Sequence, residues 1–253
     1  MKKMGGYAVV FFIFAYLITL LITVPASLLD SYLQYASQGR LVLANASGTI
    51  WSGSATPALR PKEGRLIALH ALNCDVDALS LLTGKIKARL QWNDLPTASA
   101  MEAAISFNRI ELQHVFFLLP ARILSEVSPI LKPSQLHGQL QLHSEQLILS
   151  KYGVDGAAVV DWEQAGSALS SIEPLGNYRL TLNGTGGRIN IGLSTISGVL
   201  LLERQGNWSA PQGLEFHGKA HASPGNYGNL TELLHHLGPE VSPEMHAFSL
   251  TPQ

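Results

Sequence analysis

The sequence predicts a mainly β protein, in which one N-terminal transmembrane helix is followed by a twisted, largely antiparallel β-sheet domain with a few short helices. Two observations carry this prediction. The first is an apolar run at residues 5–24. The second is a period-two alternation of apolar and polar residues, which recurs from Gly39 onward in short segments closed by Gly, Pro, Asn or Ser. Such alternation is typical of strands in a sheet with one wet face.

The N-terminal apolar run is long enough to cross a bilayer. Lys2 and Lys3 precede it, and no further charge follows until Asp30. Twenty helical residues rise roughly 30 Å, which matches the hydrocarbon thickness of a membrane. Because the lysines precede the run, we expect the N-terminus to stay in the cytoplasm and the bulk of the chain to cross. A signal peptide cleaved near residues 24–26 is the alternative, although its apolar core would be unusually long.

Four segments after the apolar run show strand alternation most clearly. KIKARLQW at residues 85–92 places apolar side chains on one face and Lys, Arg or Gln on the other. The same pattern recurs in LHGQLQLH (136–143), NYRLTLNG (177–184) and GRINIGL (187–193). Between the last two segments, NGTGG at residues 183–187 predicts a glycine-bearing hairpin turn.

Three segments have the spacing of short helices. Residues 75–84 open with a candidate N-cap, Asp75, and close with glycine. Residues 112–131 are apolar over their first half, and Pro120 is able to begin a new helical turn. Residues 229–238 carry leucines at i, i+3, i+4 and i+7 before a Gly-Pro stop. We expect these helices to cover apolar edges of the sheet.

The domain also contains a faint internal repeat. The matching pairs are 39–55 with 198–213 and 84–100 with 153–170. Each pair shares a strand and a tryptophan near its end. Duplication of an antiparallel unit predicts two halves, at residues 39–112 and 136–223, joined by a helical segment at 113–131. Strand composition alone could produce the same matches.

The stretch GTIWSGSA at residues 48–55 raises the question of a nucleophilic serine. A nucleophile elbow needs a G-x-S-x-G frame between a strand and a helix, with histidine and carboxylate partners. Here Ile50 stands two residues before Ser52, so the frame fails. We therefore interpret Trp51 as the end of a strand and residues 52–54 as the following turn. We expect no enzymatic activity.

No pattern in the sequence predicts a cofactor, a metal site or a nucleic-acid partner. Among the nine histidines, His217 and His221 are four residues apart. On a strand this spacing is about 13 Å, too far for both to bind one ion. Seventeen basic residues balance eighteen acidic ones, which provides no basic surface for a polyanion. The single cysteine, Cys74, cannot form an internal disulfide, so burial and strand pairing must stabilise the domain.

Several further segments are similar to a known family. A short basic N-terminus and one span are followed by ASGTIWSGSA (46–55), QW (91–92), DWEQAGSALSSIEPLGNYRLTLNG (161–184), LSTISGVLLLERQGNW (193–208) and FHGKAHASP (216–224). In this order they resemble the type II secretion system protein N family of Gram-negative bacteria. The resemblance extends from about residue 1 to residue 245. Its most specific parts are residues 48–53, the Pro-Leu-Gly-x-Tyr pattern at 174–178, and residues 197–208.

The resemblance implies a cytoplasmic N-terminus at residues 1–4, a transmembrane helix at 5–25 and a periplasmic β-rich domain at 26–253. Such a protein would be a single-pass component of the cell inner membrane, accessory to the machine that exports folded proteins across the outer membrane. The implied partners are other inner-membrane secretion subunits and the bilayer. The sheet is also distantly similar to the AsmA-like proteins, so a lipid-binding or lipid-transfer module with an apolar groove is the alternative.

The family implies no catalytic residue, so the residues singled out are structural. Those expected in turns and in the core are Gly48, Trp51, Gly53, Trp92, Pro174, Gly176, Tyr178 and Trp208. The small residues Gly5, Gly6 and Ala15 are candidates for packing the membrane helix against a partner helix.

Overall fold

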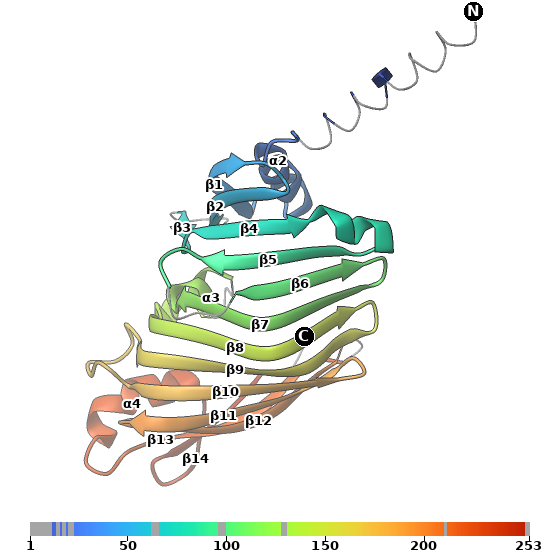
Figure 1. The fold of residues 1–253 in the computed structure, drawn as a ribbon. Helices are drawn as coiled ribbons and strands as arrows, with labels where there is room; N and C mark the ends of the chain where they lie inside the picture. Colours follow the sequence, from blue (N-terminus) through green and yellow to red (C-terminus); the bar gives the residue numbers. More distant parts are fainter. Residues whose placement is uncertain are drawn as a thin grey trace, which may run out of the picture.

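A single antiparallel sheet runs through almost the whole protein in the computed structural model (Figure 1). The structure describes residues 12, 13, 16, 19, 23–61, 66–95, 100–127, 131–209 and 212–250. The sheet has 15 strands in the order β1-β2-β4-β5-β6-β7-β8-β9-β10-β11-β12-β13-β15-β14, and β3 pairs with β2. Nearly every strand therefore pairs with its neighbour in sequence, which is the arrangement that short turns favour. The mainly β, antiparallel prediction is confirmed.

The strands lengthen toward the middle of the sheet. They are β1 Leu41–Gly48, β2 Ser52–Leu59, β3 Ile67–Ala68, β4 Leu72–Asp77, β5 Ile86–Trp92, β6 Met101–Ser106, β7 Arg109–Pro120, β8 His137–Ser150, β9 Gly153–Gly166, β10 Gly176–Thr185, β11 Arg188–Gly198, β12 Leu200–Ser209, β13 Gly213–Ala222, β14 Glu240–Ser242 and β15 Met245–Leu250. The helices are α2 Ser27–Ala36, α3 Arg122–Val127 and α4 Tyr227–Leu237, with 3-10 turns η1 Ala78–Thr83 and η2 Lys132–Ser134.

The strand register keeps polar and apolar side chains on opposite faces. One row of cross-strand partners is polar, namely Asp75, Arg89, Glu102 and Gln113. The adjacent row, one residue along each strand, is apolar, namely Val76, Ala88, Ala103 and Leu112. Because side chains alternate across a strand, these two rows point to opposite sides of the sheet. The predicted hairpin is present also, with Thr185 opposite Arg188 across a two-glycine turn.

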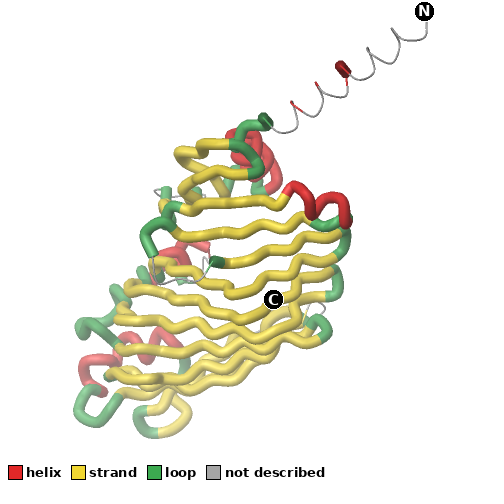
Figure 2. The backbone as a smooth tube through the Cα atoms, in the orientation of Figure 1, coloured by secondary structure: helices red, strands yellow, loops and turns green. Residues whose placement is uncertain are grey.

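Helices α2, α3 and α4 and the core are placed unevenly along the sheet. Helix α2 lies beyond β1, whereas α3 and α4 lie toward one end of the strands (Figure 2). Helix α4 packs its leucines Leu230, Leu233 and Leu234 into a buried hydrophobic cluster, which includes Leu200 of β12 and Ala220 of β13. Its predicted limits, residues 229–238, agree with Tyr227–Leu237. The sequence therefore located this helix correctly, because a strong apolar period is bounded by a Gly-Pro stop.

The other two helix predictions were wrong in part. Residues 113–120, predicted as part of a helical joining segment, belong to strand β7, and helix α3 covers only Arg122–Val127. Val115 is 1% exposed, and residues 116–120 are all partly buried. Both faces of this part of the strand are therefore shielded, so the sequence lacks alternation and resembles an apolar helix. Residues 75–77 also end a strand, and the cap of η1 is Asp77 rather than Asp75.

The predicted membrane span falls mostly on residues that the structure does not describe. Residues 5–11 and most of 12–22 lie outside the described part of the chain, as do Gly5, Gly6 and Ala15. Within the described part, no helix is both long enough and apolar enough to cross a membrane. The span at residues 5–25 therefore stays a prediction from the sequence.

Candidate functional site

The chain immediately after the predicted span is paired with the β1–β2 turn. Pro25 forms an isolated antiparallel bridge with Thr49. Two backbone hydrogen bonds flank this bridge, from Ala26 N to Gly48 O at 3.1 Å and from Ile50 N to Val24 O at 3.0 Å. Ala26 is also buried, with 7% of its surface exposed. Residues 24–26 thus act as a short extra strand on the β1–β2 hairpin, and we call this contact the junction.

The turn that holds the junction differs from the sequence interpretation. The hydroxyl of Thr49 accepts hydrogen bonds from the amides of Trp51, at 3.3 Å, and Ser52, at 3.2 Å. Residues 49–51 therefore make the turn, and Ser52 begins strand β2. The prediction that Trp51 ends a strand and that residues 52–54 form the turn was wrong, because the Thr49 side chain sets the turn earlier. The Ser52 hydroxyl donates to the Asp75 carboxylate at 2.6 Å across the two strands.

Two glycines allow strands β1 and β2 to approach each other closely beside the turn that holds the junction. Gly48 has a φ of +85°, and a Cβ there would lie 2.5 Å from the Ser52 carbonyl oxygen. A Cβ on Gly53 would lie 2.6 Å from the Ser47 oxygen and 2.8 Å from the Thr49 oxygen. Any side chain at either position would push the turn away from its neighbours. The glycines of GTIWSGSA thus allow the close-packed turn that holds the junction, and they are not part of a nucleophile elbow.

Helix α2 covers the outer edge of strand β1, the first strand of the sheet. The Leu43 amide donates to Asp30 Oδ1 at 2.7 Å, and the Leu41 amide donates to Ser37 Oγ at 2.9 Å. Gln34 donates to the other Asp30 oxygen at 2.8 Å. The Leu43 amide and then the Gln34 amide lower the pKa of Asp30, because both hydrogen bonds favour the carboxylate. Unpaired edge amides invite association, so α2 closes this edge of the sheet.

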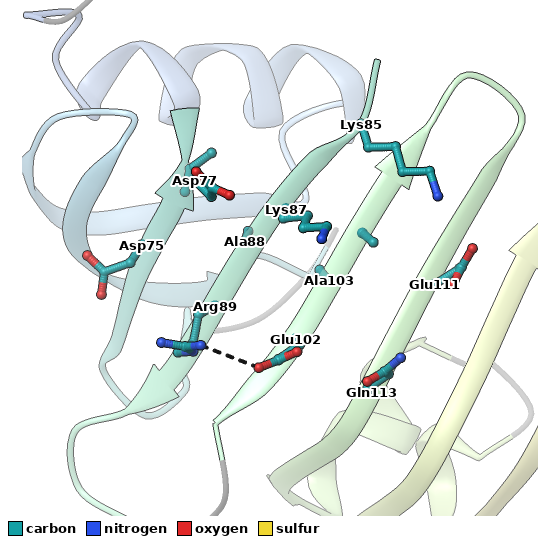
Figure 3. Close-up of a pocket in the computed structure, with 12 residues that line it drawn as sticks. Asp75, Asp77, Lys85, Lys87, Ala88, Arg89, Glu102, Ala103, Glu111 and Gln113 are labelled. Carbon is teal, nitrogen blue, oxygen red and sulfur yellow. Dashed lines mark ion pairs between the residues drawn. The ribbon is translucent and has the colours of Figure 1, made fainter. Parts of the chain in front are cut away.

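The polar face of β4 to β7 contains a hollow of about 710 Å³ lined by charges of both signs (Figure 3). Arg89 Nη2 lies 3.5 Å from Glu102 Oε1, and both side chains are more than half exposed. Four acidic and three basic residues line the hollow, namely Asp75, Asp77, Glu102 and Glu111 with Lys85, Lys87 and Arg89. Exposed pairs of this kind contribute only about 0–1 kcal/mol each. Since the charges nearly cancel, the hollow has no strong preference for an ion of either sign.

The opposite face carries an apolar hollow of about 410 Å³ in the second half of the sheet. Leu142, Leu147, Val154, Gly156, Ala158, Leu182, Gly184, Ile189, Ile191, Trp208 and Leu214 line it. These residues come from six consecutive strands, β8 to β13. Gly156 and Gly184 are direct cross-strand partners, and a Cβ on either would collide with a backbone oxygen of a neighbouring strand, Gln146 O or Val154 O. The hollow can accommodate apolar groups but offers them no charged partner.

The structure places the other predicted structural residues in several separate positions. Trp92 is 6% exposed, donates from Nε1 to the Phe116 carbonyl at 2.7 Å and stacks edge-on against Phe117. Tyr178 is 2% exposed and donates to the Leu200 carbonyl at 3.0 Å, and burial raises the pKa of its hydroxyl. Trp208 lines the apolar hollow. These residues are not brought together into one site.

Pro174 and Gly176 lie just before and at the start of strand β10. Pro174 follows a cis peptide bond with Glu173. Gly176 is buried, and a Cβ on it would lie 2.4 Å from the Ser197 carbonyl oxygen of β11. The Pro-Leu-Gly-x-Tyr pattern therefore marks the close approach of two strands and the buried Tyr178 that follows.

Two histidines meet in the described ranges, His235 of α4 and His246 of β15, whose rings lie edge to face with their centroids 5.1 Å apart. His217 and His221 both lie on strand β13, where their cross-strand partners are Gln205 and Leu201. Across residues 23–61, 66–95, 100–127, 131–209 and 212–250, no group of three or more His, Cys, Asp or Glu side chains is arranged to bind a metal ion. Cys74 is a half-buried thiol, and desolvation is the main cause that raises its pKa.

Comparison with known proteins identifies the family. The model of the family described as "Type II secretion system (T2SS), protein N" matches residues 39–248 of the chain. The chain belongs to this family. No curated protein and no solved structure matched it. The resemblance inferred from the sequence is thus confirmed, and membership of the family indicates an accessory role in type II secretion, in association with the cell envelope.

Sequence reasoning missed the two most informative features of the β1 edge. The junction pairs residues 24–26 with 48–50, and no spacing of residues in the sequence indicates such a contact. Helix α2 was also missed, although Leu28, Tyr32 and Tyr35 stand at i, i+4 and i+7. This spacing was the signal that could have found it.

Proposed function

We propose that the protein is an accessory component of the type II secretion system, held in the inner membrane by one helix at residues 5–25. Its sheet stands in the periplasm and contacts other inner-membrane secretion subunits, and the protein catalyses no reaction. The family match supports the secretion role. The positions of Lys2 and Lys3 before the apolar run support the topology.

The junction is the observation that carries this proposal. Because Ala26 pairs with Gly48 and Pro25 bridges to Thr49, no flexible linker separates the predicted span from the sheet. A domain held this way stays close to other anchored subunits, so modest contacts gain from a raised effective concentration. The free periplasmic carrier that a cleaved signal peptide would produce does not need this pairing.

The two edges of the sheet suggest where a partner binds. Helix α2 already accepts hydrogen bonds from the outer amides of β1. At the other edge, β14 has three residues and pairs with β15 only through Glu240–His246 and Ser242–Met245. Because β14 pairs only with the first residues of β15, the later residues of β15 keep an edge with which a partner strand can pair. We place the subunit contacts at this β14–β15 edge.

A pair of glycine substitutions tests the proposal. Gly53→Ala introduces a Cβ that collides with the Ser47 and Thr49 carbonyl oxygens beside the β1–β2 turn that holds the junction, whereas Gly228→Ala on α4 places its Cβ in open space. In cells, we expect Gly53→Ala to reduce both the cross-linking to other inner-membrane secretion subunits and the export of folded substrates, at unchanged abundance. Gly228→Ala should behave as wild type. Normal export by Gly53→Ala, or a mature chain that begins at Ser27, would contradict the proposal.

The apolar hollow favours a second candidate function, that of a lipid-binding or lipid-transfer module. Its lining is aliphatic and aromatic, and the apolar row continues toward β4 through Leu112, Ala103, Ala88 and Val76. Acyl chains need such a surface and no polar partner. Native mass spectrometry of the detergent-extracted protein would detect bound phospholipid. Ala158→Trp, which fills the hollow, should abolish the lipid adduct, and an adduct of unchanged abundance would place the lipid elsewhere.

A further inference from the structure

Helix α2 turns a polar side toward the sheet and an apolar side outward, which is the reverse of an ordinary surface helix. Its sheet-facing side carries Asp30 and Gln34, which bond to each other, and Asp30 also accepts a hydrogen bond from the Leu43 amide of β1. Its outer side carries Leu28, Tyr32 and Tyr35, which are 56%, 67% and 86% exposed. Because they stand at i, i+4 and i+7, these three side chains form one stripe, which we call the outer stripe.

Such a stripe needs an explanation, whereas single exposed apolar residues do not. A surface helix normally turns its apolar side to the core and its polar side to water. Leu29, 40% exposed, widens the stripe. A contiguous apolar strip on the outside of a helix marks a surface that is covered in the functional state.

The position of α2 along the chain indicates what covers it. The helix begins at Ser27, three residues after Val24, the last residue of the apolar run. Three residues span at most about 11 Å. The headgroup layer beyond each side of the hydrocarbon is roughly 5–8 Å thick. If residues 5–24 cross the bilayer, the first turn of α2 therefore lies at or beside the headgroup layer.

The chemistry of the outer stripe suits that layer. Tyrosine is enriched where membrane meets water, because its ring is apolar and its hydroxyl can remain hydrated. The helix contains no Lys or Arg, so attraction to anionic headgroups does not contribute. The contact must then depend on apolar burial, which predicts binding to neutral lipid and little dependence on salt.

We propose that the outer stripe of α2 lies in the interface of the inner membrane, as a second membrane contact beside the transmembrane helix. The proposal rests on the anchor at residues 5–25 proposed above. The span alone would leave the sheet free to swivel about residue 24. The stripe, together with the junction, instead fixes β1 at the membrane surface and directs the remaining strands away from it. The occupant is the lipid surface itself rather than a partner protein.

Depth-dependent fluorescence quenching tests this proposal on the full-length protein. Single cysteines replace Leu28, Tyr32 or Tyr35 in a Cys74→Ala background, carry an environment-sensitive dye, and are reconstituted into phosphatidylcholine vesicles containing spin-labelled lipid. Ile196→Cys and Val241→Cys are matched controls, because Ile196 and Val241 are exposed apolar residues in the last third of the sheet. We expect blue-shifted emission and strong quenching at the three stripe positions, unchanged by high salt, and neither effect at the controls.

The outcomes separate this proposal from the anchor on which it rests. Alkaline carbonate washing of the same vesicles reports whether the chain spans the bilayer. Retention of the chain with unquenched stripe probes would overturn the stripe contact and leave the anchor intact. Release of the chain would contradict the anchor itself, and the stripe contact with it. Stripe probes that are shielded only when secretion subunits are added would identify a protein as the occupant, and would also overturn the proposal.

Discussion

Helices α2 and α4 are both amphipathic and both pack on the sheet, yet they are turned in opposite directions. In α4, Leu230 and Leu234 are fully buried, whereas Asn229, Glu232 and His236 are exposed. In α2, Asp30 faces the sheet, and Tyr35 is 86% exposed. The same amphipathic pattern therefore has two uses, since α4 stabilises the core and α2 presents an apolar surface outward. Substitutions in the two helices should accordingly separate folding stability from membrane contact.

The largest expected effect on stability is in α4. Leu234→Ala removes a fully buried side chain from the core cluster, and should lower the free energy of unfolding by about 2–5 kcal/mol. Leu28→Ala deletes the same atoms from the exposed side of α2, and should change it by less than about 0.5 kcal/mol. Urea unfolding of the detergent-solubilised variants measures both. Equal decreases in the free energy of unfolding would mean that the outer stripe is packed within the protein. The two helices would then not differ in the way described.

A smaller effect is expected where α2 closes the edge of the sheet. Asp30→Ala leaves the Leu43 amide without its acceptor, and should cost on the order of 1 kcal/mol because the site is only partly buried. Ser31→Ala is the matched control, since the Ser31 hydroxyl bonds only within α2, to Ser27. Thermal unfolding of both variants gives the comparison. An unchanged unfolding temperature for Asp30→Ala would show that the hydrogen bond to the edge of β1 adds no measurable stability.

The Asp30 carboxylate should make the free energy of unfolding weakly dependent on pH. The pKa of Asp30 is lower in the folded protein than its usual value of 3.8, so folding favours the ionised form. This contribution is present above the unfolded pKa and is lost as the pH falls through the folded pKa. The difference in unfolding free energy between wild type and Asp30→Asn should therefore shrink as the pH falls below about 4. A difference that stays constant to lower pH would assign the contribution to another group.

The smallest effect on stability is expected from the outer stripe itself. Replacing Tyr32 and Tyr35 together by serine should change the unfolding free energy in detergent by less than about 0.5 kcal/mol, because both side chains are exposed. In vesicles, the same variant should show faster hydrogen exchange over α2, since the membrane no longer shields it. A stability loss as large as that of Leu234→Ala would place these tyrosines in the fold instead.

The alternation of apolar and polar residues predicted the strands that have one buried and one exposed face. Residues 187–193 alternate as predicted, and Leu193 and Ile191 face Leu180 and Leu182 of β10. Residues 113–120 were predicted wrongly, because from Val115 onward the strand is shielded on both faces and loses the period that distinguishes it from a helix. The turn at Thr49 was misplaced, since one side-chain hydroxyl decides which residues leave the strand.

The candidate site could not be predicted in the same way. The junction joins residues 24–26 to residues 48–50, and a pairing of two short segments has no periodic signature. Helix α2 did have one, at Leu28, Tyr32 and Tyr35, but a pattern alone does not say whether its apolar side faces a core or a membrane. The contacts of Asp30 with β1 decide that question, and they require the fold.

The chain that follows the proposed membrane span is fixed to the sheet without a flexible linker. Hydrogen exchange at single-residue resolution, on the full-length protein in lipid nanodiscs, tests it most directly. The amides of Ala26, Ile50 and Leu43 donate the hydrogen bonds of the junction and the α2 edge. We predict that they exchange as slowly as amides in the middle of the sheet, for example in β9 and β10. Exchange at the rate of an unstructured linker would contradict the claim.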